Sequence, residues 1–311
     1  MRLAHFRRAP VVFIFALAQL VAQTPGKWTI NLRKALGSQY ACAVYRPIQF
    51  LSEDEILLLA GPTDNCYRSV SQLQLVVLSV TGHVTARRDW PSTYPGVVLS
   101  HKRLAVAAWD QLLVLDDRLT TTQTISLPKH RAFPILSSDE QGLSVVTDAG
   151  LLLCTGMPLK CEERRSDREA KSGEQTIYRF ADGRGLTREG ELLMKSNGES
   201  PSQRVADLSW VVPRCERYVN CQAYDAGTTF QVVSGTKRRV LVASNGSKFP
   251  VTDAAGLFPY FRLQVFDLDT GSEIYREQDV LRTGRRGAAL SPEGDLLAAF
   301  DGATVVMRRL K

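Results

Sequence analysis

The amino-acid sequence predicts an all-β chain folded as one β-propeller, and three observations support this. Short apolar runs with strand-like alternation fill the chain, no long amphipathic stripe marks a helix, and the runs recur as a unit. The unit is about 40 to 50 residues long, which suits a propeller blade of four short strands. A two-sheet sandwich would not require one unit to resemble the next.

The strand pattern is clear along the chain. In WTINLR, Trp28, Ile30 and Leu32 alternate with polar residues, while runs such as RRVLVAS and ATVVMRRL are rich in β-branched residues and bounded by turn formers. The charged residues 161–175 lack an apolar stripe, so we expect a surface loop there.

The repeat is best preserved in RGAALS-PEG-DLLAAF-DG-ATVVMRRL, which reads as three strands separated by two turns. The equivalent positions of six units are Ser52, Ser100, Ser137, Ala181, Ser234 and Ser291, spaced by 48, 37, 44, 53 and 57 residues. Six such positions predict six blades. A seventh blade within residues 205–225 is the alternative, but we favour six, with that segment forming the outer strand of the fourth blade and a loop.

The last unit has room for only three strands, so its fourth strand must come from elsewhere in the chain. Residues 27–36, KWTINLRKAL, are the expected donor. This N-terminal strand would close the ring and leave no open sheet edge.

The N-terminus predicts a secretory signal peptide over residues 1–23. Arg2, Arg7 and Arg8 precede an apolar run that is too short to span a bilayer comfortably and that ends in small and polar residues. We expect cleavage near Gln23, which leaves residues 24–311 as one propeller domain in the periplasm or outside the cell. No later stretch is apolar for about 18 residues, so the mature chain should have no transmembrane segment.

Charge and cysteines fit an exported protein. Loss of the three signal-peptide arginines lowers the formal net charge from +7 to +4, and the basic pairs are scattered without interleaved aromatics, so no nucleic-acid partner is expected. The even cysteine count suggests disulfides, for which six cysteines allow 15 pairings. Pairing between sequence neighbours is the prediction: Cys42 with Cys66, Cys154 with Cys161, and Cys215 with Cys221.

Two turns of the last blade resemble those of a known family. Asp267 with Thr270 and Gly271 reads D-x-x-T-G, and the residues from Ser291 to Gly294 read S-P-E-G. These turns resemble the D-x-x-T-G and S-P-D-G turns of bacterial exported β-propellers related to WD and YVTN repeats. The resemblance covers roughly the last 50 residues, and it implies the fold more than a function.

Local motifs for catalysis or metal binding are not found in the sequence. The histidines of the mature chain, His83, His101 and His130, are dispersed, and no C-x-x-C, P-loop or nucleophile elbow occurs. Acidic pairs such as Asp139-Glu140 fall at predicted turns. We therefore expect no metal and no cofactor, although local motifs do not reveal a site assembled from several blades around the axis.

One aromatic segment is a candidate binding surface. Residues 249–261, FPVTDAAGLFPYF, interrupt the fifth unit and are too apolar for an ordinary loop. The segment either covers a blade edge or forms part of a binding face. In the second case Phe249, Phe258, Tyr260 and Phe261 would be the contacts.

The function expected from these features is that of an exported, non-catalytic binding or scaffold module. It would be a monomer whose partner is another protein or an envelope component. The alternative is a propeller hydrolase or lactonase with its site in the central channel. Three or more carboxylate, Asn or His side chains converging on the axis would favour the enzyme, whereas the innermost strands VVLS, PILS, QVVS and AALS are apolar and small.

Overall fold

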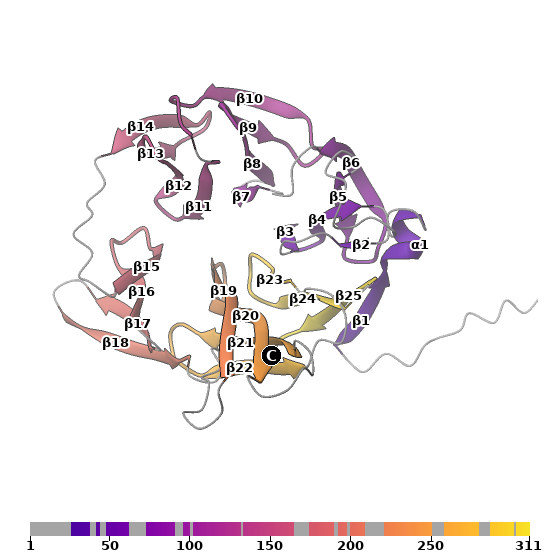
Figure 1. The fold of residues 1–311 in the computed structure, drawn as a ribbon, viewed down its shortest axis with the longest axis vertical. Coiled ribbons are helices and arrows are strands. Elements are labelled where there is room, and N and C mark those ends of the chain that lie inside the picture. The colour runs from indigo at the N-terminus through magenta and orange to yellow at the C-terminus, as the bar shows by residue number, and fades with distance from the viewer. Residues whose placement is uncertain are drawn as a thin grey trace, which may run out of the picture.

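In the computed structural model, the described residues form six antiparallel sheets arranged as a ring (Figure 1). The structure describes residues 26–37, 42–43, 48–61, 73–90, 96–99, 102–131, 133–164, 174–189, 192–197, 200–208, 221–250, 258–279, 287–301 and 303–311. The predicted signal peptide, residues 1–23, lies outside them. The all-β propeller with six blades is confirmed.

Blades I to VI follow the chain, and the first strand given below for each blade lies innermost, except in blade I, where the second strand does (Figure 1). Blade I contains β2 Cys42–Ala43, β3 Gln49–Ser52, β4 Glu55–Gly61, β5 Leu73–Ser79 and β6 Val84–Trp90. Blade II contains β7 Val97–Leu99, β8 Arg103–Ala108, β9 Gln111–Leu115 and β10 Thr121–Ser126. Blade III contains β11 Ile135–Asp139, β12 Gly142–Thr147, β13 Gly150–Thr155 and β14 Lys160–Arg164.

The second half of the ring repeats this plan. Blade IV contains β15 Glu174–Arg179, β16 Gly185–Glu189, β17 Leu192–Asn197 and β18 Ser200–Asp207. Blade V contains β19 Cys221–Ser234, β20 Arg238–Pro250, β21 Phe258–Asp267 and β22 Glu273–Asp279. Blade VI contains β23 Ala288–Leu290, β24 Leu296–Asp301, β25 Thr304–Arg309 and, as its outer strand, β1 Lys27–Asn31.

The N-terminal strand closes the ring as the sequence predicts. β1 pairs antiparallel with β25, from Lys27 opposite Arg308 to Asn31 opposite Thr304. The indole nitrogen Nε1 of Trp28 also donates to the carbonyl of Val80 in blade I, at 2.9 Å. Blade VI is thereby joined to its neighbour on the outer side of the ring.

The closing strand is shorter than expected. Residues 27–36 were predicted as one strand, but α1 Leu32–Leu36 follows β1 directly. The Asn31 side chain accepts a hydrogen bond from the backbone N–H of Lys34, at 3.1 Å, and so caps the N-terminus of this helical turn. Leu32 and Leu36 then become buried on one side of the turn.

The hydrophobic core is divided among the interfaces between blades. Five apolar clusters are present in the described chain, and each joins two neighbouring blades: I with II, II with III, IV with V, V with VI, and VI with I. None of the five joins blade III to blade IV. There the described contacts include hydrogen bonds, such as the one at 2.7 Å from the Ala181 N–H to Glu140 Oε2.

Candidate functional site

The ring has two faces with different residues. The turns between the first and second strands of each blade, and between the third and fourth, lie on one face, which we call the front. The remaining turns and the connections between blades lie on the other face, the back. This division follows from the antiparallel order of the strands in each sheet.

Carboxylates on the front face join neighbouring blades. Glu293, in the turn between β23 and β24, accepts hydrogen bonds from the backbone N–H and the hydroxyl of Thr236 in blade V. The Glu293 backbone N–H in turn donates to Glu53 Oε1 of blade I, at 2.6 Å. These bonds with Thr236 hold the pKa of the Glu293 carboxyl below its usual range. The Glu293 carboxylate of the last blade therefore has a structural role.

The D-x-x-T-G turn also has a structural role. Asp267 Oδ1 accepts hydrogen bonds from the backbone N–H groups of Asp269 and Thr270, at 3.0 and 2.8 Å, and from the Thr270 hydroxyl, at 2.9 Å. Burial alone would raise the pKa of Asp267, but the bonds from Thr270 and Asp269 outweigh it and the pKa is lowered. Gly271 takes the left-handed conformation of the turn, at φ +71°.

Two glutamines join inner strands of adjacent blades. The Gln231 amide in β19 donates to the carbonyl of Leu290 in β23 and accepts from its N–H, at 3.0 and 2.7 Å. Gln49 in β3 makes the same pair of bonds with blade II, to the Gly96 carbonyl at 2.9 Å and from the Val98 N–H at 3.1 Å. Both glutamines lie three residues before the repeat positions found in the sequence.

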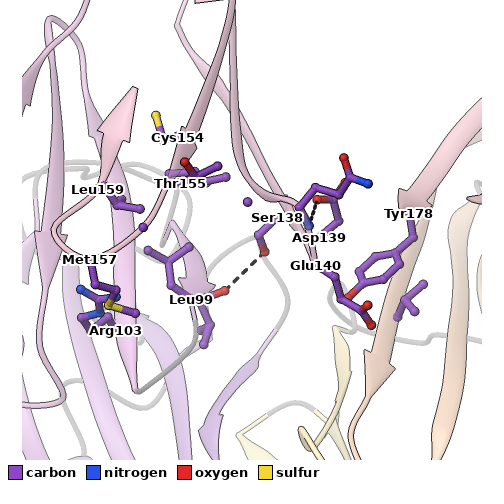
Figure 2. A pocket seen from close by; sticks show the side chains of 16 residues that line it. Leu99, Arg103, Ser138, Asp139, Glu140, Cys154, Thr155, Met157, Leu159 and Tyr178 are labelled. Carbon is purple, nitrogen blue, oxygen red and sulfur yellow. Dashed lines mark hydrogen bonds between the residues drawn. The ribbon is translucent and has the colours of Figure 1, made fainter. Parts of the chain in front are cut away.

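A pocket lies on the front face where this glutamine position is occupied by other residues. In blades II and III the equivalent residues are Val97 and Pro134. The pocket has a volume of about 630 Å³ and is lined by residues of blades II to V. Figure 2 shows Arg103 and Met157 at one end and Glu140 and Tyr178 at the other, with Leu99 and Ser138 between them.

The polar groups of the pocket are held by local bonds. Asp139 Oδ1 accepts a hydrogen bond from the backbone N–H of Gln141, at 2.9 Å, and the Ser138 hydroxyl donates to the Val98 carbonyl, at 3.4 Å. Burial raises the pKa of Asp139, against the effect of the Gln141 bond. Burial also raises the pKa of Tyr178, whose hydroxyl is hydrogen bonded to Ser234. The turn position predicted for Asp139-Glu140 is confirmed, and the same turn lines the pocket.

The back face carries an exposed aromatic cluster on blades II and III. Trp109, in the turn between β8 and β9, is 52% exposed, and its ring centroid lies 5.6 Å from that of His130 and 6.3 Å from that of Phe133. Phe133 is 41% exposed. We call Trp109, His130 and Phe133 the aromatic platform.

Hydrogen bonds fix the segment that carries the platform to both blades. At its start the Leu127 N–H donates to the Asp110 carbonyl of blade II, at 2.8 Å. Further on, the Arg131 N–H donates to both oxygens of the Asp148 carboxylate in blade III, at 2.9 and 3.0 Å. The apolar side chains are therefore presented on a fixed backbone.

The aromatic residues predicted from residues 249–261 have a different setting. Phe249 is the next-to-last residue of β20 and Phe258 begins β21, so the two described ends of the segment expected as a loop belong to a long hairpin of blade V. Phe261 is 1% exposed and belongs to the core between blades V and VI. The side chains of Phe249, Phe258 and Tyr260 lie outside the described part, and their contact with a partner stays a prediction.

One predicted cysteine pair falls within the described residues. Cys154 in β13 lies directly opposite Cys161 in β14, and their sulfur atoms are joined at 1.96 Å. Cys66 and Cys215 lie outside the described residues, so the pairings with Cys42 and Cys221 stay predictions. A count of free thiols in the unfolded, unreduced protein would test whether these cysteines are oxidised.

Two further searches of the described residues gave no candidates. No group of three or more His, Cys, Asp or Glu side chains is placed to hold a metal ion. No helix in this part of the chain has the length and apolar character needed to cross a membrane.

The chain is thus a six-bladed β-propeller with a pocket on its front face and an aromatic platform on its back face. Neither the scan of known protein families nor the search of curated proteins finds a match to its sequence.

Solved structures give similarities at low sequence identity. The WD40 repeats of RRP9 are 10% identical, cover 93% of this chain and 98% of their own, and have a TM-score of 0.45. U3-55K is 9% identical with coverages of 93% and 99% and a TM-score of 0.46. The Kuenenia stuttgartiensis hydrazine synthase is 12% identical with coverages of 82% and 74% and a TM-score of 0.39. Likeness at this level does not bear on function.

Proposed function

We propose that this protein is an exported, non-catalytic propeller that binds another protein, an envelope component included, through the aromatic platform. One observation carries the proposal. Five large hydrophobic side chains are exposed in the described part of the chain, and two of them, Trp109 and Phe133, lie on the back face with their ring centroids 6.3 Å apart. Exposed apolar side chains gathered in this way are typical of protein interaction sites.

The backbone at Trp109 supports a role for its side chain. Trp109 has φ +47°, in the left-handed region that glycine or asparagine occupies at low cost. A bulky residue held there costs roughly 1–3 kcal/mol, so its presence favours a use of the indole beyond the fold. Tryptophan is also enriched among the residues that dominate binding energy at protein interfaces.

The platform fits a folded protein better than a small ligand. Trp109 comes from a turn of blade II, and His130 and Phe133 come from the connection between blades II and III. The exposed Lys129 and Arg131 lie in the same connection as Phe133. A partner with an apolar centre and acidic residues at its edge would complement this surface, since interfaces combine an apolar core with a polar rim.

The export part of the proposal is supported by the sequence of residues 1–23 and by the cross-strand Cys154–Cys161 pair. Expression in a secreting bacterial host should give a mature chain that begins near residue 24. Intact mass and N-terminal sequencing of the periplasmic or secreted fraction measure this. A chain that keeps residues 1–23 in the cytoplasmic fraction would contradict export without affecting the platform.

The binding part is tested with a platform variant and a matched control. Trp109→Gly removes the indole and relieves the backbone, so the variant should unfold at the same or higher urea concentration than the wild type. Met157→Ser removes a similarly exposed hydrophobic side chain from the front face. Proteins captured from the envelope fraction by immobilised wild type should be retained by Met157→Ser and lost by Trp109→Gly.

Two outcomes would overturn the proposal. Equal capture by Trp109→Gly and wild type would show that the platform does not bind the partner. Turnover of ester or lactone substrates by the purified protein would favour the enzyme instead. The molar mass of the protein can also be measured by light scattering over a range of concentrations. A dimer that Trp109→Gly converts to a monomer would identify the platform as a contact between two copies of this chain.

A further inference from the structure

Arg103 is partly buried, and its guanidinium group differs from the charged groups of two fully buried basic residues. Arg239, 2% exposed, donates from Nη1 to the Gly294 carbonyl at 2.6 Å and from Nη2 to the Lys311 carbonyl at 2.5 Å, so that only its Nε is buried without an acceptor in the described part of the chain. Lys195, 6% exposed, donates to the Leu268 carbonyl at 3.2 Å. Arg103 begins β8 and lines the front-face pocket, yet its Nε and Nη2 are buried without an acceptor in the described part of the chain.

The two unpaired nitrogens form one edge of the guanidinium group. Their N–H bonds point in parallel, and this edge matches the two oxygens of a carboxylate in a bidentate pair. Buried donors without a partner cost free energy, and native proteins seldom keep them without a reason. An acceptor that enters the pocket would satisfy both donors at once.

The other lining residues restrict what that acceptor can be. Leu99, Leu143 and Val232 provide apolar walls, which suit a ligand with a hydrophobic body. Asp139 and Glu140 line the same pocket and would repel a doubly charged phosphate more strongly than a singly charged carboxylate. The pocket therefore favours a monocarboxylate over a phosphate.

We propose that the front-face pocket binds an apolar organic monocarboxylate through paired hydrogen bonds from Arg103 Nε and Nη2. Met157 lies at the same end of the pocket as Arg103 (Figure 2) and is 47% exposed. Its unbranched side chain has three rotatable bonds and can move aside as the carboxylate enters. This site is on the face opposite the aromatic platform, so it does not depend on the proposed protein partner.

The test uses N-acetylleucine as the probe and its neutral amide as the matched compound, in calorimetric titrations of the purified protein. The acid should bind at least about tenfold more tightly than the amide. A hydrogen bond between two charged groups is stronger than one to a neutral group by about the free energy that corresponds to a tenfold change in affinity. Arg103→Met should weaken binding of the acid to the level of the amide. Arg103→Lys should weaken it as well, because it keeps the charge but loses the parallel donors.

Two controls separate this proposal from general charge effects and from misfolding. Arg118→Met removes an exposed positive charge from the same blade and should leave the affinity within about twofold of wild type. The Tm of Arg103→Met should equal or exceed that of wild type, because the substitution removes buried unpaired donors. N-acetylleucine should raise the Tm of wild type and leave that of Arg103→Met unchanged.

Several results would overturn the proposal. These are equal binding of the acid and the amide, retained affinity in Arg103→Met, and tighter binding of inorganic phosphate than of N-acetylleucine. A lower Tm for Arg103→Met would also count against it, since the guanidinium would then be a structural group. Loss of the protein partner in the Trp109→Gly experiment has no bearing on any of these readouts.

Discussion

The glutamine that joins blades V and VI offers the sharpest test of how the ring is held together. Leu290 is 0% exposed, and its backbone N–H and carbonyl both face the Gln231 amide. A glutamine amide offers the same donor and acceptor as a peptide group, so it takes the place of a neighbouring strand at this point. Gln231→Ala removes both partners and leaves two backbone groups unsatisfied.

The cost follows from these two groups. Each buried, unpaired backbone group costs about 1–3 kcal/mol. Gln231 itself is only partly buried, so water reaches part of the gap, and we expect a loss near the lower end, about 2–3 kcal/mol. With a urea dependence of about 2–3 kcal/mol per molar, the unfolding midpoint should fall by roughly 1 M.

Urea unfolding followed by tryptophan fluorescence measures this midpoint, and two further variants sharpen the result. Gln203→Ala, on the exposed outer strand of blade IV, should stay within about 0.5 kcal/mol of wild type. Gln231→Glu should be destabilised at pH 7 and recover below about pH 4, where the protonated carboxyl can donate to the Leu290 carbonyl. If Gln231→Ala and Gln203→Ala unfold at the same urea concentration, the hydrogen bonds of Gln231 do not hold blades V and VI together.

Three other predictions concern the same interfaces. Trp28→Phe removes the bond to Val80 and should cost about 1 kcal/mol, measured by urea unfolding; a midpoint equal to wild type would refute it. A Cβ on Gly235 would lie 2.6 Å from the Pro292 carbonyl oxygen, so Gly235→Ala should lower the free energy of unfolding by about 1–3 kcal/mol. The control Gly185→Ala should lower it less, because the nearest atom to its Cβ would be 3.4 Å away. Equal costs would exclude close contact between the turns. Asp267 and Glu293 have lowered pKa values in the folded chain. Their contributions to the stability of the fold are therefore complete above their pKa values in the unfolded chain, near 4, and are lost as the pH falls through their pKa values in the folded chain. The urea midpoint should therefore drop less between pH 5 and pH 2.5 in Asp267→Asn and Glu293→Gln than in wild type; equal drops would show that other groups govern acid stability.

Much of the fold could be predicted because each blade repeats a local pattern. Ser52 and Ser234 end β3 and β19, and Ser291 follows β23, so the repeat positions mark the ends of innermost strands. The turns at residues 291–294 and 301–302 were predicted from their glycines and their acidic or proline residues. The short helix after Asn31 was missed because one turn of five residues has no helical period to detect.

The candidate sites could not be predicted in the same way. The pocket joins Arg103, Asp139 and Tyr178, which approach one another only when three blades meet, and each looks like an ordinary strand or turn residue in the sequence. Gln231 and Leu290 are likewise 59 residues apart. Trp109 had a signal, since a tryptophan followed by aspartate at a tight turn is unusual on a solvated surface, but its neighbours His130 and Phe133 came from another segment.

The pairing of β1 with β25 has a consequence for the order of events during synthesis. Asn31 pairs with Thr304, so one strand of the closing sheet is made 273 residues before the other. At about 5–20 residues per second, the first strand waits roughly 15–55 s for its partner. During that interval the chain has five blades at most and an unclosed end, and its unpaired sheet edges are targets for chaperones until the ring is finished.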